Sequence, residues 1–296
     1  MKNILITTEE FLLNDFPADF KVVKNPYGRK LSEQEADDLI QRHRPTGMIA
    51  GIEPLTRNTM ARAPFLKVIS RCGIGLDSVD LQAASELGIK VANTPDAPTP
   101  AVAELAVALM LAGLRKISVM DRQIRLGKWP RPMGFLLAGK TVGLIGCGRI
   151  GGYTAKLLKT FGCNVLGYDP YVKAASFCRL CALEELLRDS DIVSLHVPHT
   201  AENHHLLNRE RIFAMQTGAM LVNTARGGLV DEEALYDALT RGHLSGAALD
   251  CFENEPYAGP LANLENVVLT AHVGSNAKEA RLVMERQALE NLVKEI

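Results

Sequence analysis

Four polar side chains follow the ends of three consecutive apolar runs in the second half of the sequence. They are Arg226, Asp250, Glu255 and His272. If these runs are parallel strands of one sheet, their carboxyl ends share one edge, which is where such sheets bind ligands. Histidine exchanges a proton near neutral pH, a glutamate can fix its tautomer, and an arginine fork can hold a carboxylate. A single histidine or arginine in a loop is often only structural, but this convergence favours a site for acid–base chemistry.

A glycine pattern precedes these residues in the chain. Residues 139–152 read GKTVGLIGCGRIGG, in which Gly146, Gly148 and Gly151 fit G-x-G-x-x-G between a strand pattern and a helical one. Such glycines permit a tight turn, close approach of the backbone to a pyrophosphate, and packing of the helix on the strand. The next strand ends in Asp169, where a carboxylate would bind ribose hydroxyls and disfavour a 2′-phosphate. We therefore expect NAD as cofactor, the alternative being that Asp169, before Pro170, is only a turn residue.

Short β-rich runs alternate with helical patterns along the whole chain, which predicts an α/β fold with parallel sheets. Residues 93–100 read NTPDAPTP, a stiff connector between two such series. We place one domain at 1–94 with 275–296, because a last helix capped by Ser275 can return to the first series, and the other at 95–274. The expected strands are 4–7, 20–23, 48–50, 66–70, 89–92, 141–145, 164–168, 192–196, 219–223, 245–249 and 267–270, and the expected helices include 32–43, 81–86, 101–114, 149–160, 183–188, 209–214, 231–241 and 275–293.

Composition excludes several classes of protein. Of 296 residues, 47% are hydrophobic and 23% charged, with 33 Lys and Arg against 34 Asp and Glu. Such a chain can form a core, and its balanced charge gives no reason to expect nucleic acid or an anionic membrane as partner. The most apolar stretch, 100–114, contains Glu104 and is too short to span a membrane, so a buried helix is expected. Six scattered cysteines and no signal-peptide pattern favour the cytoplasm.

The motifs resemble those of the D-isomer-specific 2-hydroxyacid dehydrogenase family, and most closely its phosphoglycerate dehydrogenase branch. The similar segments occur in the family's order and include the glycine pattern and all four strand-end residues. They are SRCGIGLDSVDL (70–81), NTPDAPTPAVAELAVALML (93–111), VGLIGCGRIG (142–151), GYDP (167–170), LHVPHTAENHHLLN (195–208), NTARGGLVDEEAL (223–235), GAALDCFENEP (246–256) and TAHVGS (270–275).

The resemblance implies a fold of two Rossmann- or flavodoxin-like domains with a cleft between them, and a homodimer formed through helix 101–114 of the NAD domain. It implies that His272 donates or accepts the proton, with Glu255 as its partner, and that Arg226 orients the substrate. Asp250 would bond the nicotinamide carboxamide. The other implied cofactor contacts are Gly146, Gly148, Arg149, Ile150, Gly151, Asp169, Val197, Pro198, Thr224, Ala225 and Gly274, and the implied substrate loop contains Arg71, Gly73 and Ile74.

The substrate expected from this branch is D-3-phosphoglycerate, with hydroxypyruvate, glyoxylate or another 2-keto acid as the alternative. The loop 50–56, where phosphoglycerate enzymes carry a basic residue, here contains Glu53 and no base before Arg57. Arg71 and Arg131 remain as phosphate-binding candidates. The chain ends at Ile296, so we expect no serine-sensing domain like that of longer relatives. A binding protein that senses NAD, like the corepressors related to this family, is a further alternative.

Two other motifs carry weaker signals. The pair Cys178 and Cys181 forms a single CxxC, whereas zinc ribbons need a second pair. The run HVPHTAENHH, 196–205, contains four histidines but has no group of acids near it in the sequence. We interpret it as cofactor wall and solvated loop, and expect no metal site.

Overall fold

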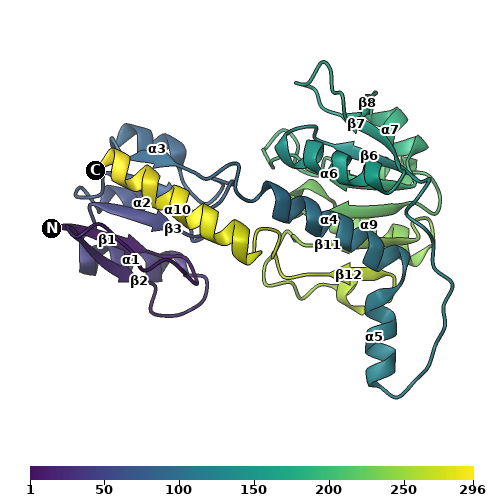
Figure 1. The fold of residues 1–296 in the computed structure, drawn as a ribbon, viewed down its shortest axis with the longest axis horizontal. Coiled ribbons are helices and arrows are strands. Elements are labelled where there is room, and N and C mark those ends of the chain that lie inside the picture. Colours follow the sequence, from purple (N-terminus) through teal and green to yellow (C-terminus); the bar gives the residue numbers. More distant parts are fainter. The chain divides into compact units, whose positions relative to one another are not determined.

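A computed structural model describes residues 1–296, which form two compact units (Figure 1). The smaller unit contains Met1–Pro98 and Ser275–Ile296, and the larger unit contains Thr99–Gly274. Each unit is built on one parallel sheet, so the predicted fold class of two parallel-sheet α/β domains is confirmed. The structure divides the chain after Pro98, four residues beyond the predicted position. None of the helices has the length and apolarity needed to cross a membrane.

The smaller unit contains a five-stranded parallel sheet in the order β2-β1-β3-β4-β5. Side chains alternate between its two faces, as the period of a strand requires. Leu5 and Met48 belong to the core on one face, whereas Ile4, Ile6 and Ile49 belong to the core on the other. The strands are β1 (Lys2–Ile6), β2 (Phe20–Lys24), β3 (Gly47–Ala50), β4 (Val68–Arg71) and β5 (Lys90–Ala92).

Helices cover both faces of the smaller sheet. One core includes residues of α1 (Glu33–His43), α2 (Arg57–Ala61) and α3 (Leu81–Glu86). The opposite core includes residues of α10 (Lys278–Glu295), which lies along the sheet in Figure 1. The expected return of the last helix to this sheet is therefore observed. The predicted cap Ser275 is wrong, because the helix begins at Lys278 with Ala277 as its N-cap and no side-chain cap bond.

The larger unit contains a seven-stranded parallel sheet in the order β12-β11-β10-β9-β6-β7-β8. Six of these strands were expected with nearly these bounds, and only β8, a pair of residues, was not. Counted along the chain from β6, the first six strands give the Rossmann order 3-2-1-4-5-6, in which the order reverses between β6 and β9. The strands are β6 (Thr141–Ile145), β7 (Asn164–Tyr168), β8 (Arg179–Leu180), β9 (Ile192–Leu195), β10 (Met220–Asn223), β11 (Gly246–Leu249) and β12 (Val267–Leu269).

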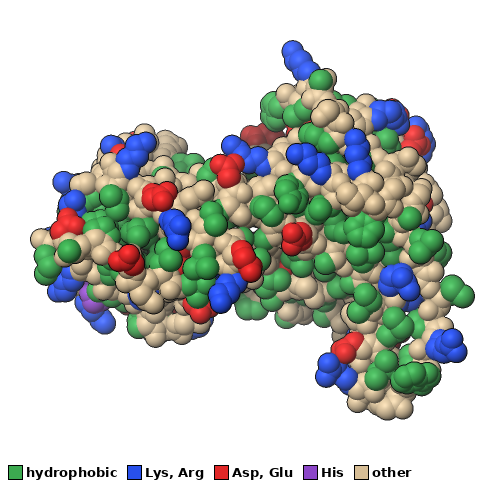
Figure 2. Space-filling view, viewed as in Figure 1, with side chains coloured by type: hydrophobic (Ala, Val, Ile, Leu, Met, Phe, Trp, Pro, Cys, Tyr) green, Lys and Arg blue, Asp and Glu red, His purple; other side chains and the backbone are tan.

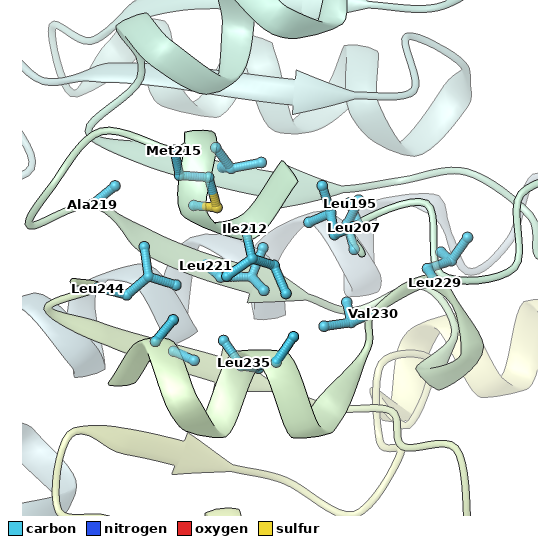
Figure 3. Close-up of a cluster of buried hydrophobic side chains, with 14 of the residues drawn as sticks. Leu195, Leu207, Ile212, Met215, Ala219, Leu221, Leu229, Val230, Leu235 and Leu244 are labelled. Carbon is cyan, nitrogen blue, oxygen red and sulfur yellow. The ribbon is translucent and has the colours of Figure 1, made fainter. Parts of the chain in front are cut away.

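Two apolar cores enclose the larger sheet. The core on one face contains residues of α7 (Leu183–Asp189), α8 (Arg209–Ala214) and α9 (Glu232–Thr240), and Figure 3 shows Leu235 of α9 beneath the strands. The core on the other face contains residues of α4 (Thr99–Leu114) and α6 (Arg149–Thr160). Half of α4 is buried within its own unit, which accounts for much of its apolar composition.

A second helix after α4 was not expected. Lys116 adopts a positive φ of 53°, and the chain then forms α5 (Ile117–Arg125) before the segment 126–139 returns to β6. None of the nine residues of α5 is buried. Several large apolar side chains of α5 and the following segment are exposed: Ile117, Ile124, Leu126, Trp129, Met133, Phe135 and Leu136.

Candidate active site and cofactor site

The glycine turn lies where the strand order of the larger sheet reverses, directly after β6 and beside the loop after β9. Gly146 has a φ of 103°, and a Cβ there would lie 2.5 Å from the carbonyl oxygen of His196. A Cβ on Gly151 would lie 2.0 Å from the carbonyl oxygen of Gly146. Both positions therefore require glycine, since an added carbon would collide with rigid backbone.

Gly148 differs from the other two glycines. It is exposed, a Cβ there would have no atom within 4 Å, and it is the N-cap of the 12-residue helix α6, without a side-chain cap bond. This open space adjoins the positive end of a helix, which suits a pyrophosphate. Arg149 and Ile150 are the first residues of that helix, and Val197 lies against Gly146.

Asp169 follows β7 and links two loops. Its Oδ2 accepts a hydrogen bond of 2.9 Å from the amide of Cys147, and its Oδ1 accepts one of 2.9 Å from the amide of Tyr171. The second bond is the turn contact that the alternative interpretation expected. The first holds the carboxylate beside the glycine turn. Because an ionised carboxylate has about four acceptor positions, the two interpretations are compatible.

The loop after β10 adds a further observation that fits a bound dinucleotide. The side-chain oxygen of Thr224 is buried and has no hydrogen-bond partner. Buried hydroxyls are usually satisfied, so an unpaired one at a sheet edge indicates a missing polar partner. Together with the open space at Gly148, this oxygen fits the expected cofactor. Ala225 follows it, and Pro198, exposed, follows β9.

His272 and Glu255, which the sequence predicts to act as an acid–base pair, are in contact in the loops after β12 and β11. Nδ1 of His272 lies 3.0 Å and 2.9 Å from the two carboxylate oxygens of Glu255. The amide of Phe252 also donates to Glu255 Oε1, at 3.1 Å. Since Glu255 accepts from Nδ1, Nε2 is the ring nitrogen that can exchange a proton with a substrate. The His272 side chain is 35% exposed, so it can be reached.

Asp250 binds the side chain of Thr270 before His272 and the two backbone amides that follow His272. It is fully buried, and its Oδ1 accepts from Thr270 Oγ1 at 2.6 Å and from the amide of Val273 at 2.9 Å. Its Oδ2 accepts from the amide of Gly274 at 2.8 Å. His272 itself has a positive φ of 52°, which is costly for a residue with a side chain. We infer that Asp250 keeps the loop in this conformation, a role that the sequence did not reveal; its predicted bond to a nicotinamide carboxamide stays a prediction.

Arg226 lies in the loop after β10, next to the loop that carries Asp250 and Glu255. A Cβ on the following Gly227 would lie 1.8 Å from the backbone of Phe252, so the two loops are in close contact. Nη1 of Arg226 donates to the carbonyl oxygen of Ala225 at 2.7 Å. The thiol of Cys251 lies among these groups, and its pKa is raised by burial and by Asp250. The larger sheet thus brings Arg226, Glu255 and His272 to one edge.

The predicted substrate loop belongs to the smaller unit. Arg71 ends β4, is 9% exposed, and donates to the carbonyl oxygen of Cys72. Gly73 has a φ of 147° and lies beneath the Arg71 guanidinium. Its amide donates to Thr94 Oγ1 at 2.8 Å, and the carbonyl oxygen of Ile74 accepts from Asn93 at 2.7 Å. Arg131, the other phosphate candidate, is exposed in the segment after α5.

Glu53 lies where the strand order of the smaller sheet reverses, between β1 and β3. It is 1% exposed, accepts from Thr7 Oγ1, and accepts from the amide of Gly51 at 3.2 Å. Burial raises the pKa of Glu53, while Thr7 and the charge of Arg71 oppose the rise. The sequence showed only that no base stands here. The structure adds that the carboxyl group points inward, toward β1.

Comparison with known proteins is consistent with this geometry. Residues 107–274 match the model of the D-isomer specific 2-hydroxyacid dehydrogenase, NAD binding domain. The chain is 44% identical over 235 residues to a D-3-phosphoglycerate dehydrogenase of Methanocaldococcus jannaschii, covering 77% of this chain and 45% of that protein. It thus spans less than half the length of that relative.

Two further similarities cover most or nearly all of both chains. The chain is 44% identical over 249 residues to a hydroxypyruvate reductase of Thermotoga maritima, covering 82% of this chain and 81% of that protein. The crystal structure of the TT0316 protein from Thermus thermophilus superposes with a TM-score of 0.87 and 40% identity, covering 98% of this chain and 96% of that one.

Proposed function

Because the chain belongs to the D-isomer-specific 2-hydroxyacid dehydrogenase family, whose NAD-binding domain it contains, we propose that it is an NAD-dependent dehydrogenase of a small D-2-hydroxy acid. The observation that carries this proposal is the contact between His272 Nδ1 and both oxygens of Glu255. This pair lies at the same sheet edge as the glycine turn. In this proposal the larger unit holds NAD, and the domain of residues 1–94 and 275–296 contributes the substrate loop.

Nε2 of His272 removes the hydroxyl proton of the 2-hydroxy acid as its C2 hydrogen leaves as hydride. The imidazole becomes an imidazolium, and the Glu255 carboxylate on Nδ1 stabilises that charge. In the reverse direction the imidazolium returns the proton to the carbonyl oxygen. Arg226 orients the substrate carboxylate, because its planar guanidinium can donate two parallel N–H···O hydrogen bonds to the two carboxylate oxygens. Bound NAD supplies the hydride acceptor, or as NADH the donor.

The residues proposed to hold NAD surround the glycine turn. Gly146, Gly148 and Gly151 form the cradle of the pyrophosphate with Arg149 and Ile150, and Asp169 accepts from the ribose hydroxyls. Val197, Pro198, Thr224, Ala225 and Gly274 form the cofactor's wall.

D-3-phosphoglycerate is the first candidate substrate, as the name of the Methanocaldococcus relative suggests. Hydroxypyruvate or glyoxylate is the second, and the buried carboxyl group of Glu53 favours it. The loop at the reversal point of the smaller sheet offers this buried carboxyl group and no basic side chain that could bind a phosphate. The relative named hydroxypyruvate reductase is similar over most of its length.

A panel of substrates tests the proposal and separates the candidates. NADH formation with D-3-phosphoglycerate at alkaline pH is measured beside NADH oxidation with hydroxypyruvate and glyoxylate. Activity with the phosphorylated acid alone would support the first candidate and a role in serine biosynthesis, with Arg71 and Arg131 as phosphate ligands. Activity with the unphosphorylated acids alone would support the second. NAD binding without turnover on any acid would favour an NAD-sensing binding protein instead.

We also propose a homodimer formed through the larger unit. The expected interface helix, 101–114, lies in α4, and half of α4 is buried. We add to the proposed interface α5 and the segment 126–136, which carry several exposed large apolar side chains. In Figure 2 hydrophobic side chains gather near the projecting end of α5. Trp129 is 79% and Met133 85% exposed, and groups of exposed apolar side chains of this kind are typical of protein interfaces. Light scattering of Trp129→Glu beside the wild type tests this interface, and an unchanged dimer would contradict it.

All six cysteines are free thiols in the structure. Free cysteines suit a reducing compartment, which supports a place in the cytoplasm.

A further inference from the structure

A second group of histidines lies at the carboxyl edge of the larger sheet, outside the proposed catalytic pair. His199, His204 and His205 are three of the seven histidines of the chain. Nε2 of His199 lies 3.1 Å from Nδ1 of His204. The rings of His204 and His205 are stacked, with centroids 4.0 Å apart. Three imidazoles are thus placed side by side by a short stretch of one loop.

The fold brings acids to this group that are distant in the sequence. Nε2 of His205 is in hydrogen-bond contact with a carboxylate oxygen of Glu253, which lies in the loop after β11. The amide of Glu253 donates to Oε1 of Glu232 in α9 at 2.9 Å. The expectation of no metal rested on the lack of nearby acids, and that premise is wrong in three dimensions.

The backbone fixes the directions of these side chains. His205 has a positive φ of 50°, and its amide donates to the carbonyl oxygen of Gly228 at 2.8 Å. A Cβ on Gly228 would lie 2.8 Å from Nε2 of His199, so the ring lies directly over that glycine. Asn203 closes the loop by accepting from the amide of Thr200 at 2.7 Å. A strained conformation held by several bonds is typical of functional positions.

We propose that His204, His205 and Glu253 bind a transition-metal ion, with Zn²⁺ as the ion they suit best and His199 as a fourth donor. The nearest donor atoms of the first three lie within 4.8 Å of one another. A tetrahedral zinc ion with bonds of about 2.0–2.1 Å holds its donors about 3.4 Å apart, so small side-chain movements complete the site. Imidazole and carboxylate are ordinary zinc ligands.

The ion replaces the direct hydrogen bond between His205 and Glu253. It also joins the loop after β9 to the loop after β11. Glu255, the partner of His272, lies two residues beyond Glu253 in the same loop. Binding of the ion therefore stabilises the loop that also carries Glu255. The ion itself takes no part in the proposed reaction.

The test is calorimetric titration of metal-free, tag-free protein with Zn²⁺, together with the absorption spectrum of the Co²⁺ form. We expect one strong site per chain and a Tm that rises with zinc concentration. The double variant H204A/H205A should weaken zinc binding at least tenfold and abolish the cobalt visible bands. Glu253→Gln, which keeps the size of the side chain, should also weaken zinc binding. It provides the test if the double variant does not fold.

Two controls separate this site from others. Cys251, Glu255 and His272 form another group with metal-ligand spacing, so His272→Ala should leave the strong site intact. His43→Ala, in the smaller unit, should also bind zinc as the wild type does. Wild type without a strong site would overturn the proposal. So would H204A/H205A or Glu253→Gln with undiminished affinity, or loss of the site in His272→Ala.

Discussion

The carboxyl edge of the larger sheet and that of the smaller sheet hold their charged groups in different ways. At the larger edge His272 and Glu255 are bonded to each other, yet their side chains remain 35% and 27% exposed. At the smaller edge Arg71 and Glu53 are 9% and 1% exposed. His272 and Glu255 lie in neighbouring loops at the surface, whereas Arg71 and Glu53 are buried within the smaller unit.

This difference indicates a division of tasks. A group that exchanges protons with a substrate must be accessible, and its replacement should alter the rate more than the stability. A buried titratable group is screened from solvent and substrate, and its replacement should alter the free energy of unfolding and its pH dependence. The two edges can therefore be distinguished by which quantity each substitution changes.

The largest expected effect is that of His272→Ala at the exposed edge. Loss of the general acid–base should lower kcat by about 10²–10⁴-fold. Affinity for NAD and Tm should change little, because the side chain is half-buried and contacts chiefly Glu255. Steady-state kinetics and NAD titration measure this. His43→Ala, in the smaller unit, is the control and should leave kcat unchanged. An undiminished kcat in His272→Ala would remove the basis for the mechanism.

Asp250→Ala should have the next largest effect. The loop 270–274 loses three hydrogen bonds, and a displacement of His272 of about 1 Å can lower kcat by up to about 10²-fold. If Asp250 only positions this loop, the Kd of NAD stays close to the wild-type value. A Kd raised in parallel with the loss of kcat would instead support the predicted bond to the nicotinamide carboxamide. Fluorescence titration with NADH separates the two results.

Asp169→Ala should weaken NAD binding about tenfold, as expected for loss of charge-assisted hydrogen bonds. It should also reduce discrimination against NADP, because the carboxylate no longer repels the 2′-phosphate. The measurement is kcat/KM with each cofactor. Tyr171→Ala is the control, since its backbone amide still occupies Asp169 Oδ1. If Asp169→Ala keeps the wild-type preference for NAD, another residue recognises the ribose.

The smallest effect is expected at the buried edge, for Glu53→Gln. The folded pKa of Glu53 is raised above its ordinary value of 4.5, so folding favours the protonated form. That stabilisation is complete below pH 4.5 and is lost as the pH rises through the folded pKa. The free energy of unfolding of the variant should differ from that of the wild type by under about 1 kcal/mol at pH 4. As the pH increases, the variant should become more stable relative to the wild type.

Urea unfolding at several pH values measures this difference in the free energy of unfolding. If the free energies of unfolding of Glu53→Gln and the wild type differed by the same amount at every pH, Glu53 would have the same pKa in the folded and unfolded states, which would contradict this prediction.

Much of the fold could be predicted because its elements carry strong local signals. The strands β6 and β7 and the helix α6 were predicted with their observed bounds, since apolar β-rich runs and the glycine turn delimit them. The helix α5 was missed because only the positive φ of Lys116 separates it from α4, and a conformation of this kind has no clear sequence signal at lysine. The helix α2 and the strand β8 are too short for periodicity to reveal.

In the candidate active site, too, only the features with a local sequence signal could be predicted. His272 and Glu255 could be placed together because parallel strands bring their carboxyl ends to one edge. The bonds of Asp250 depend on the backbone of Val273 and Gly274, whose direction follows from the loop and not from residue type. The contact of His205 with Glu253 joins residues 48 positions apart, and nothing in either motif indicates it.

The helix α10 has a consequence for synthesis on the ribosome. The face formed by Ile4, Ile6, Ile49 and Val68 packs against Met284, Ala288 and Leu292 of this helix. Translation must proceed from β5 to Lys278 before that cover exists, which takes roughly 10–40 s at 5–20 residues per second. The larger unit is completed within this interval. The nascent smaller sheet therefore presents an uncovered apolar face while its neighbour folds, which makes it the part of the chain that a chaperone would hold.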